Sequence, residues 1–251
     1  MRPSRFRSGC PNMIKRLIAI SLLLVPALAF ASGDSVLQDS QLNHNDKASM
    51  QRGAAQFMNY CSGCHSLGFQ RYSRMAADLG LTEDEVMDNL VFTDAKFGEQ
   101  MHASLRPEDG ERWFGTAPPD LSLIARNKPG GPDWVYTFLK SFYADASRPS
   151  GWNNLLMAGT SMPHVLWEQQ GIQHPVLDSD GAIERLELAA PGRQSPAEYE
   201  RTVRDITNFL NYVGEPAAGK RRALGVWVIF FLAGFSMLAW LLKEEYWRDV
   251  H

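Results

Sequence analysis

Cysteine is scarce in this chain of 251 residues, which contains only Cys10, Cys61 and Cys64. Three cysteines are too few for a framework of disulfide bonds, so other interactions must hold the fold. The sequence also lacks internal repeats and any sustained alternation of apolar and polar residues, and it therefore gives no sign of a repeat array or a sheet-built domain. These absences favour a mainly α-helical protein with long irregular loops.

Acidic residues are missing from the start of the chain, where the first one is Asp34. Five basic residues precede the apolar stretch LIAISLLLVPALAFA, and Ala29-Phe30-Ala31 follows the small-x-small pattern of a cleavage site. Residues 1–31 are therefore predicted to be a secretory signal peptide that is cleaved after Ala31 and takes Cys10 with it. Met13 is an alternative start, and a retained membrane anchor is the other interpretation of this segment.

Removal of the signal makes the chain more acidic. The lost segment holds five basic residues and no acid, so the formal net charge falls from −3 to −8. An acidic exported domain repels nucleic acid, which excludes a nucleic-acid-binding role, and it suits a basic protein partner. Solubility alone would also account for this charge.

Charge is absent again near the C-terminus, over the twenty residues 223–242. A helix of this length spans about 30 Å, the thickness of a bilayer core. Trp227 and Trp240 lie near its two ends, as interfacial aromatic residues do. Residues 220–243 are predicted to form a transmembrane anchor, and a buried helix of a soluble protein is the alternative.

The charges flanking this run give conflicting indications of its orientation. Lys220, Arg221 and Arg222 precede it, whereas Lys243 and Arg248 follow it among three acids. Positive charge usually marks the cytoplasmic side, but a cleaved signal places the preceding domain outside. We give the signal precedence. The prediction is an exported, periplasmic domain over 32–219, a single-pass anchor in a bacterial-type inner membrane, and a short cytoplasmic tail over 244–251.

Four helices are expected in the exported domain. They cover 46–60, 82–90, 132–144 and 195–213. Thr82 and Ser195 are each followed three residues later by Glu, the pattern of a capping box, and Gly53 allows another helix to approach the first one closely. Residues 104–120 and 145–194 are rich in turn-forming residues and are predicted to be mostly irregular.

The pentad CSGCH at 61–65 carries the clearest chemical signal. In C-x-x-C-H, two thioethers fix the vinyl groups of a haem, and the adjacent histidine reaches the iron. Zinc could use the same three side chains, but no further cysteine remains to complete its ligand set. A redox disulfide would not need His65. A covalent haem c bound through Cys61 and Cys64 is the favoured interpretation.

A second axial ligand must come from elsewhere in the chain. Met162 in GTSMPH is the best candidate, because Gly159 allows the loop to turn and Pro163 restricts the backbone. A methionine ligand raises the reduction potential and suits an electron carrier. The alternatives left open are Met101, Met157, His102, His164 and His174.

Three segments together resemble the cytochrome c1 family. They are RGAAQFMNYCSGCHSL, APPDLSLIAR at 117–126, and GTSMPH, and the single anchor after NYVGEP fits as well. The resemblance covers nearly the whole mature chain. The pentad alone would indicate only a c-type cytochrome, whereas the later segments in this order are far more specific.

The resemblance implies roles for particular residues. Cys61 and Cys64 would attach the haem, and His65 and Met162 would be its axial ligands. Pro118, Pro119, Leu121 and Ile124 would line the haem pocket. Arg126 would face a haem propionate, and Lys128 stands where the family pattern has a second arginine. Lysine keeps the charge but loses the bidentate fork.

The resemblance also implies a function. The chain would not be an enzyme alone, but the electron-transfer subunit of a respiratory quinol–cytochrome c reductase, in a complex with cytochrome b that resemblance suggests is dimeric. Electrons would come from the Rieske iron–sulfur protein and leave for a cytochrome c acceptor. Two acidic groups could form the docking surface: Glu83, Asp84, Glu85 and Asp88, or Glu108, Asp109 and Glu111.

Other functions remain possible on sequence grounds. A free membrane-tethered cytochrome shuttle would need no complex. A haem enzyme or gas sensor would need five-coordinate iron and hence a Met162 that does not bind. A zinc-dependent exported module would hold no haem at all.

Overall fold

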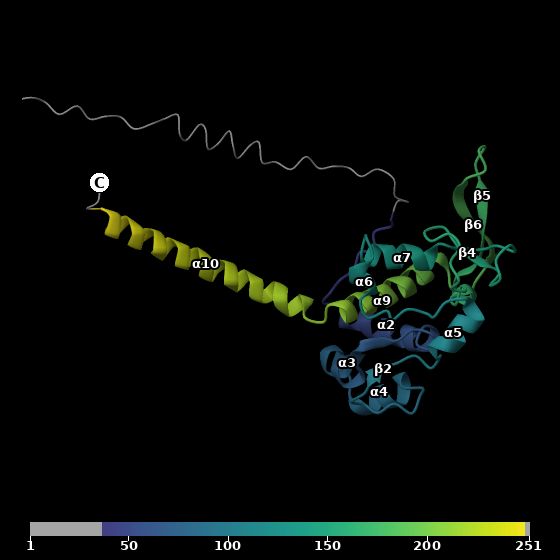
Figure 1. The fold of residues 1–251 in the computed structure, drawn as a ribbon, viewed down its shortest axis with the longest axis horizontal. Helices are drawn as coiled ribbons and strands as arrows, with labels where there is room; N and C mark the ends of the chain where they lie inside the picture. The colour runs from purple at the N-terminus through teal and green to yellow at the C-terminus, as the bar shows by residue number, and fades with distance from the viewer. Residues whose placement is uncertain (1–36, 249–251) are drawn as a thin grey trace, which may run out of the picture. The chain divides into compact units, whose positions relative to one another are not determined.

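The computed structural model describes residues 37–248, and the predicted signal peptide lies outside them. Figure 1 shows the arrangement of the helices and strands. The longer helices are α2 (Lys47–Tyr60), α3 (Tyr72–Leu79), α4 (Glu83–Leu90), α5 (Pro107–Phe114), α7 (Pro132–Lys140), α9 (Pro196–Gly214) and α10 (Ala218–Trp247). The short helices α6 (Ile124–Asn127) and α8 (Trp167–Gln170) lie in the connections. The mainly helical class is confirmed.

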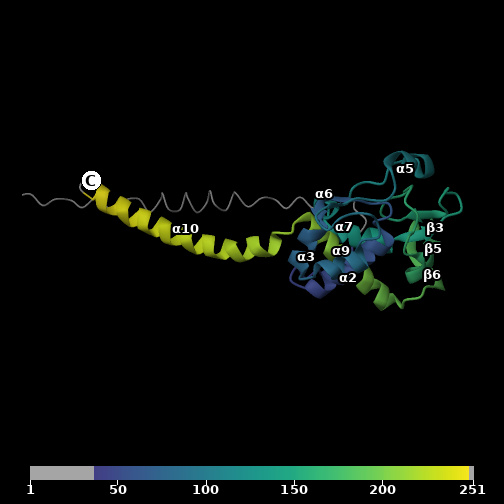
Figure 2. The same ribbon diagram turned by 90° about the horizontal axis from the view of Figure 1, so that it is seen from below.

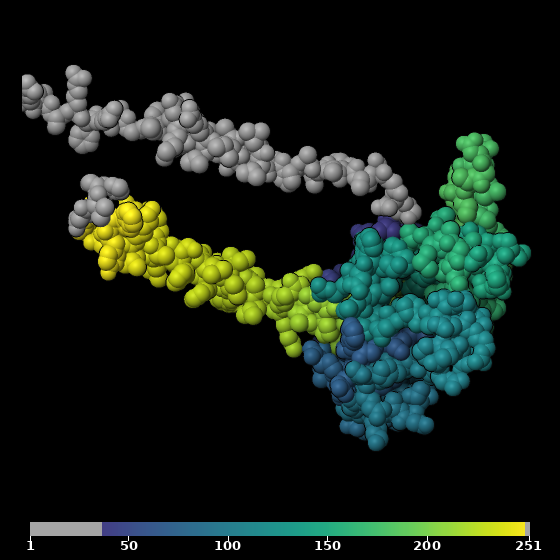
Figure 3. Space-filling model, viewed as in Figure 1, coloured from purple at the N-terminus to yellow at the C-terminus, as the bar shows by residue number. Residues whose placement is uncertain are grey.

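The strands of the described chain pair in twos, all antiparallel. They are β1 (Leu67–Arg71) with β2 (Gln100–Met101), β3 (Phe142–Ala144) with β4 (Trp152–Asn154), and β5 (Gly171–Leu177) with β6 (Ile183–Pro191). The β5–β6 hairpin stands out from the surface of its domain in Figure 3. Because most of its side chains are partly or fully exposed, its sequence shows little of the alternation that marks a half-buried strand.

The close approach predicted at Gly53 is confirmed, and the helix that packs there is the last one of the domain. Helices α2 and α9 lie side by side in Figures 1 and 2, and they approach most closely at Gly53. A Cβ built at Gly53 would lie 2.0 Å from the carbonyl oxygen of Asp205 and 2.8 Å from Cβ of Phe209. Only glycine therefore fits at this position without a shift of one helix.

A polar cluster fixes the register of the same helix pair. The buried carboxylate of Asp205 on α9 accepts hydrogen bonds from Ser49 Oγ at 2.6 Å and from Arg52 Nε at 2.6 Å. Arg52 makes a second bond through Nη2 at 3.0 Å. The buried charge is thus paired and bonded from two sides, as burial of a carboxylate requires.

The predicted helix starts at Thr82 and Ser195 are both confirmed. Thr82 accepts a hydrogen bond from the Glu85 amide, and the Glu85 carboxylate accepts one from the Thr82 amide. At the start of α9, the Glu198 carboxylate accepts from the Ser195 amide at 2.9 Å. Each box satisfies amide groups that a helix start would otherwise leave unpaired.

Three predicted boundaries or loops are wrong. The helix expected over 132–144 ends at Lys140, and residues 142–144 form strand β3. Residues 104–120 contain helix α5, which has Pro107 in its first turn and Gly115 in a left-handed conformation at its end. Residues 145–194 contain the β5–β6 hairpin, whose tip turns at Gly181 with a φ of 82°.

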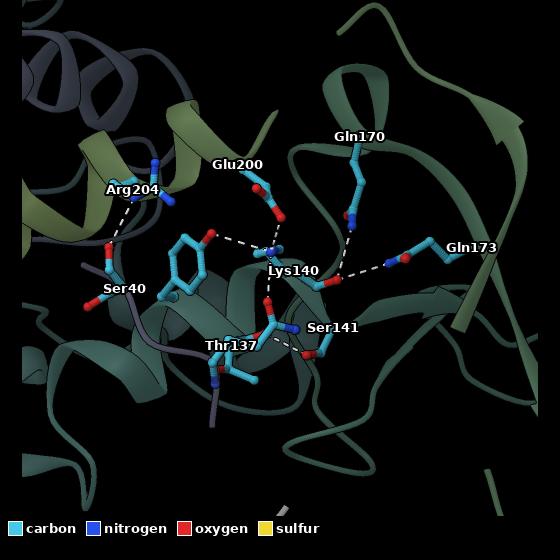
Figure 4. Close-up of polar contacts among 10 residues, drawn as sticks. Ser40, Thr137, Lys140, Ser141, Gln170, Gln173, Glu200 and Arg204 are labelled. Atoms are coloured by element: carbon cyan, nitrogen blue, oxygen red, sulfur yellow. Dashed lines mark hydrogen bonds and ion pairs between the residues drawn. The ribbon is translucent and has the colours of Figure 1, made fainter. Parts of the chain in front are cut away.

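Lys140, the last residue of α7, forms hydrogen bonds with several other elements (Figure 4). The Lys140 ammonium donates to Glu200 of α9 at 2.8 Å and to Gln38 at 2.7 Å. The Lys140 carbonyl accepts from Gln170 and Gln173, each at 3.0 Å. One residue therefore ties the N-terminal segment, α9 and the beginning of the hairpin to α7.

Helix α10 confirms that the C-terminal apolar run is helical. It is 30 residues long, extends beyond the predicted 220–243 at both ends, and is long and apolar enough to cross a membrane. Nearly all of its side chains are exposed. A buried helix of a soluble protein, the alternative interpretation, does not match this exposure.

Replacement of Gly53 by alanine is expected to lower the free energy of unfolding by about 1–3 kcal/mol, because the new methyl group forces α2 and α9 apart. Denaturant unfolding of the haem-loaded protein, followed by circular dichroism, measures this change. Gly98→Ala is the matched control, since a Cβ there meets nothing within 4 Å. Equal stabilities of the two variants would contradict the close-approach argument.

Candidate haem site

The CSGCH pentad begins where α2 ends. Cys61 is the C-terminal cap of α2 and its amide donates to the Phe57 carbonyl at 2.8 Å. The chain then turns tightly, because the amides of Cys64 and His65 both donate to the Cys61 carbonyl. This turn presents two sulfurs and one imidazole within five residues, at the end of a well-packed helix.

Both cysteines of the pentad are free thiols. Burial and the neighbouring Cys64 raise the pKa of the Cys61 thiol to about 12, and burial also raises the pKa of Cys64. A redox-active cysteine works as a thiolate, which these surroundings disfavour. Within residues 37–248, moreover, no three His, Cys, Asp or Glu side chains are grouped as a metal ion would require.

His65 is oriented by a residue far along the chain. Its Nδ1 lies 2.8 Å from the carbonyl oxygen of Pro119. A carbonyl can only accept a hydrogen bond, so Nδ1 must carry the proton and Nε2 keeps its lone pair. Burial lowers the pKa of His65, which keeps the ring neutral. A neutral imidazole whose far nitrogen is held by a carbonyl is the usual arrangement of a metal ligand.

The segment 117–122 runs beside the pentad and is bonded to it along its length. The Leu121 amide donates to the Ser66 carbonyl at 2.9 Å. The carboxylate of Asp120 accepts from the Gly68 amide at 2.8 Å. Of the predicted pocket residues, the structure therefore brings Pro119 and Leu121 next to the CSGCH turn, whereas Pro118 lies against Gly110 of α5.

Ile124 and Leu121 are partly buried and pack against the main core cluster, which includes Cys61. The two predicted propionate partners have protein partners of their own. Arg126 pairs with Glu215 at 2.8 Å, and the Lys128 ammonium lies 4.5 Å from the centre of the Trp134 ring. Their role toward a haem stays a prediction, since both side chains also have other contacts.

The loop that carries Met162 is held by side-chain hydrogen bonds. The Asn154 Oδ1 accepts from the amides of Leu156 and Met157, and the Asn153 Oδ1 accepts from the Gly159 amide at 2.8 Å. Gly159 has a φ of 78°, as the predicted turn requires. Met162 is partly buried and packs against the same core cluster as Cys61.

The other end of this loop is fixed by His164, which is 3% exposed. Its ring stacks on Phe142 at 4.9 Å between centroids and meets Trp152 edge-on at 5.1 Å. Burial lowers the pKa of His164 to about 4, so the ring is neutral. Its Nε2 is buried without a hydrogen-bond partner among the described residues, and His164 therefore stays open as an alternative ligand.

The remaining alternatives lie in less suitable surroundings. Met101 is buried in β2 opposite Leu67. Met157 is 39% exposed. His174 lies opposite Glu187 in the register of the exposed hairpin, and His102 lies beside Gly68. Met162 is partly buried and lies on a loop held by hydrogen bonds, which are the surroundings that an axial ligand needs.

Several residues that shape the site were missed from the sequence. Asn153 and Asn154 hold the Met162 loop, and Phe142 and Trp152 hold His164. The Asn pair directly before a Gly-containing loop was the available signal, because Asn side chains often bond to nearby backbone amides. Nothing in the local sequence indicated that Phe142 and Trp152 would contact His164.

The donor set fits a covalent haem. Two free thiols are three residues apart, a neutral imidazole has one nitrogen held and the other with a lone pair, and a thioether lies on a fixed loop. Together with a helix able to cross a membrane, these features define the class of a membrane-anchored c-type cytochrome.

Comparison with known proteins agrees with this class, because residues 37–250 match the Cytochrome C1 family. A cytochrome c1 of Allochromatium vinosum is 47% identical over 246 residues, which cover 95% of this chain and all of that protein. The chain therefore belongs to the cytochrome c1 family, whose name marks it as an electron-transport haem protein.

Two further relatives carry different names. A protein of Nitrosomonas europaea named ammonia monooxygenase gamma subunit is 45% identical over 241 residues, which cover 96% of this chain and all of that protein. A cytochrome b/c1 of Bradyrhizobium diazoefficiens is 24% identical over 291 residues, and the match covers 94% of this chain but 41% of that longer protein.

Replacement of Met162 by leucine is expected to lower the reduction potential and to let the ferrous iron bind carbon monoxide, because leucine offers no lone pair. Redox titration and reduced spectra of the haem-loaded protein measure both effects. Met157→Leu is the matched control and should behave as wild type.

His164→Phe tests the rival ligand, since phenylalanine keeps the ring contacts and removes the nitrogen. If the His164 variant alone binds carbon monoxide and the Met162 variant does not, then Met162 is not the ligand.

Proposed function

We propose that this protein is the one-electron carrier subunit of a respiratory quinol–cytochrome c reductase. It receives electrons from the Rieske iron–sulfur protein and passes them to a cytochrome c acceptor. The observation that carries the proposal is His65, held by the Pro119 carbonyl with Nε2 left to bind iron, directly beside two free thiols. Membership in the cytochrome c1 family supports the same role.

A haem c attached to Cys61 and Cys64 supplies the one-electron redox chemistry. His65 and Met162 would hold its iron, and no position would then remain open for dioxygen or peroxide. Transfer is then outer-sphere, and the protein's task is to hold the ligands in place in both oxidation states. Fixed ligands limit the reorganisation that accompanies transfer, and the hydrogen bonds to His65 and to the Met162 loop serve this purpose.

The pocket and the propionates involve further residues. Pro118, Pro119, Leu121 and Ile124 supply apolar walls. Arg126 and Lys128 supply positive charge for the propionates. A guanidinium has five donors, so Arg126 can keep its bond to Glu215 and still donate to a second carboxylate.

The complex lies in the bacterial inner membrane, with the haem domain on the periplasmic side. Residues 1–31 direct export, residues 32–219 form the haem domain, residues 220–243 anchor it, and residues 244–251 form the cytoplasmic tail. Cytochrome b is the expected neighbour of α10, and the relative named cytochrome b/c1 supports this pairing because its name joins both components.

The name of the Nitrosomonas relative suggests a second candidate, a subunit of an ammonia-oxidising complex. The similarity is as extensive as that to the Allochromatium cytochrome c1, so overall identity does not separate the two names. A free tethered shuttle is the third candidate. The three differ in which partners they bind.

Co-purification distinguishes these candidates. The tagged full-length chain, extracted from its native membrane in mild detergent, is expected to bring a b-type haem and an iron–sulfur signal in fixed ratio to haem c. Optical spectra and electron paramagnetic resonance measure the two partners, and membranes with untagged protein are the control. Recovery of haem c alone would support the shuttle, and recovery with ammonia-oxidising activity would support the second candidate.

The acidic groups of α4 and α5 differ in how much of their negative charge is left without a basic partner. In α5, Asp109 is paired with both Arg106 and Arg112. Helix α4 contains four acids and no basic residue, although Glu85 is used in its capping box. The α4 group is therefore the stronger candidate for docking a basic cytochrome c.

Neutralisation of Glu83, Asp84 and Asp88 by amides is expected to slow electron transfer to a basic cytochrome c by about tenfold at low ionic strength, because steering is lost. Stopped-flow kinetics at several salt concentrations measure the effect, which should vanish at high salt. The control is Glu108→Gln with Glu111→Gln. A larger effect in this control would place docking at α5 instead.

A further inference from the structure

Three basic residues, Lys220, Arg221 and Arg222, precede the uncharged run of α10. The structure gives Arg221 a local function. Its guanidinium pairs with Glu215 at 2.6 Å, and Glu215 also pairs with Arg126 at 2.8 Å. Arg221 therefore joins the start of α10 to the end of the haem domain.

Arg222, the next residue, faces a different environment. It lines a cavity of about 420 Å³ between residues 42–45 and the first turn of α10. Asn43, His44 and Asn45 form the polar wall, and Ala223 belongs to the apolar wall. No carboxylate within residues 37–248 forms an ion pair with Arg222, whereas the nearby Glu215 is neutralised by two arginines.

His44 adds a hydrogen-bond donor to the cavity wall. The side-chain amide nitrogen of Asn211 donates to its Nδ1 at 2.8 Å, so the proton of the neutral ring is on Nε2. Burial and the charge of Arg222 lower the pKa of His44 and keep it neutral, while Glu215 has the smaller opposite effect. The residues that line the cavity thus include one positive charge and one imidazole N–H donor.

The position of the cavity restricts what can bind there. It lies at the base of α10, where Ala223 begins the uncharged run and the following side chains are exposed. In a bilayer this is the level of the lipid headgroups, on whichever side the domain lies. A cavity of this volume is in the range of small-ligand sites, and a guanidinium recognises phosphate in a bidentate way.

We propose that this cavity binds the phosphodiester headgroup of a membrane phospholipid. Arg222 pairs with the phosphate, His44 donates to one of its oxygens, and the acyl chains lie along the exposed apolar surface of α10. The site would attach the haem domain to the membrane surface beside its anchor. This proposal does not depend on the redox role of the protein.

The test uses the full-length haem-loaded protein, stripped of lipid in detergent and titrated with phosphatidylglycerol in mixed micelles. Native mass spectrometry counts the bound lipid. R222Q is expected to bind at least about tenfold more weakly, the usual cost of losing a charge-assisted hydrogen bond. K220Q removes the same charge two residues away and should stay within about twofold of wild type.

A second variant tests the cavity without any change of charge. A223F fills the space with a ring and should also abolish binding. Haem spectra and circular dichroism verify that each variant is folded. Equal losses in R222Q and K220Q would show diffuse attraction to the micelle and overturn the proposal.

Two other results would also overturn it. One is the absence of bound lipid in the wild-type protein. The other is displacement of the lipid by inorganic phosphate at equal concentration, which would identify a free-anion site.

Discussion

The close approach of α2 and α9 at Gly53 is the constraint on which the rest of the structure depends. A side chain at this point would meet the backbone of Asp205, so the two helices could not lie together. The paired carboxylate of Asp205 then fixes how they are aligned. Because α2 ends in the CSGCH turn and α9 ends beside α10, the same contact positions both the CSGCH residues and the base of α10.

Hydrogen bonds order the loops that carry the candidate haem ligands. Pro119 orients His65, Asp120 and Ser66 bond the two neighbouring segments together, and Asn153 and Asn154 hold the loop that carries Met162. Irregular backbone is stable when its polar groups are satisfied in this way. An electron carrier benefits from such loops, since they can aim single side chains at one metal while remaining fixed.

Glu215 links two parts of the molecule that serve different purposes. It pairs with Arg126, which follows the APPD segment, and with Arg221, which begins the anchor. Two of the three basic residues before the span thus have local surroundings that suit them: Arg221 pairs with Glu215, and Arg222 lines a cavity at the base of α10.

The sequence by itself determined those features that depend on residues close together in the chain. The capping boxes at Thr82 and Ser195 and the uncharged run of α10 are local features, and both were predicted correctly. The haem-binding role of CSGCH is read from equally local residues, and it stays a prediction. The proposed axial role of Met162 also came from a short motif, and it stays a prediction. Helix α5 was missed although its Pro and Gly signals were present, because they were interpreted as loop residues.

Only the tertiary structure decided which nitrogen of His65 is protonated, which partner Arg126 has, and that 171–191 form a hairpin. Pro119 is 54 residues from His65, and Glu215 is still farther from Arg126 along the chain. The hairpin was not predicted, because few of its side chains are buried. Its sequence therefore shows little alternation of apolar and polar residues. Local hydrogen bonds and hydrophobic runs produce a pattern in neighbouring residues of the sequence. Contacts between distant segments depend instead on how the helices pack, and this packing exists only in the folded chain.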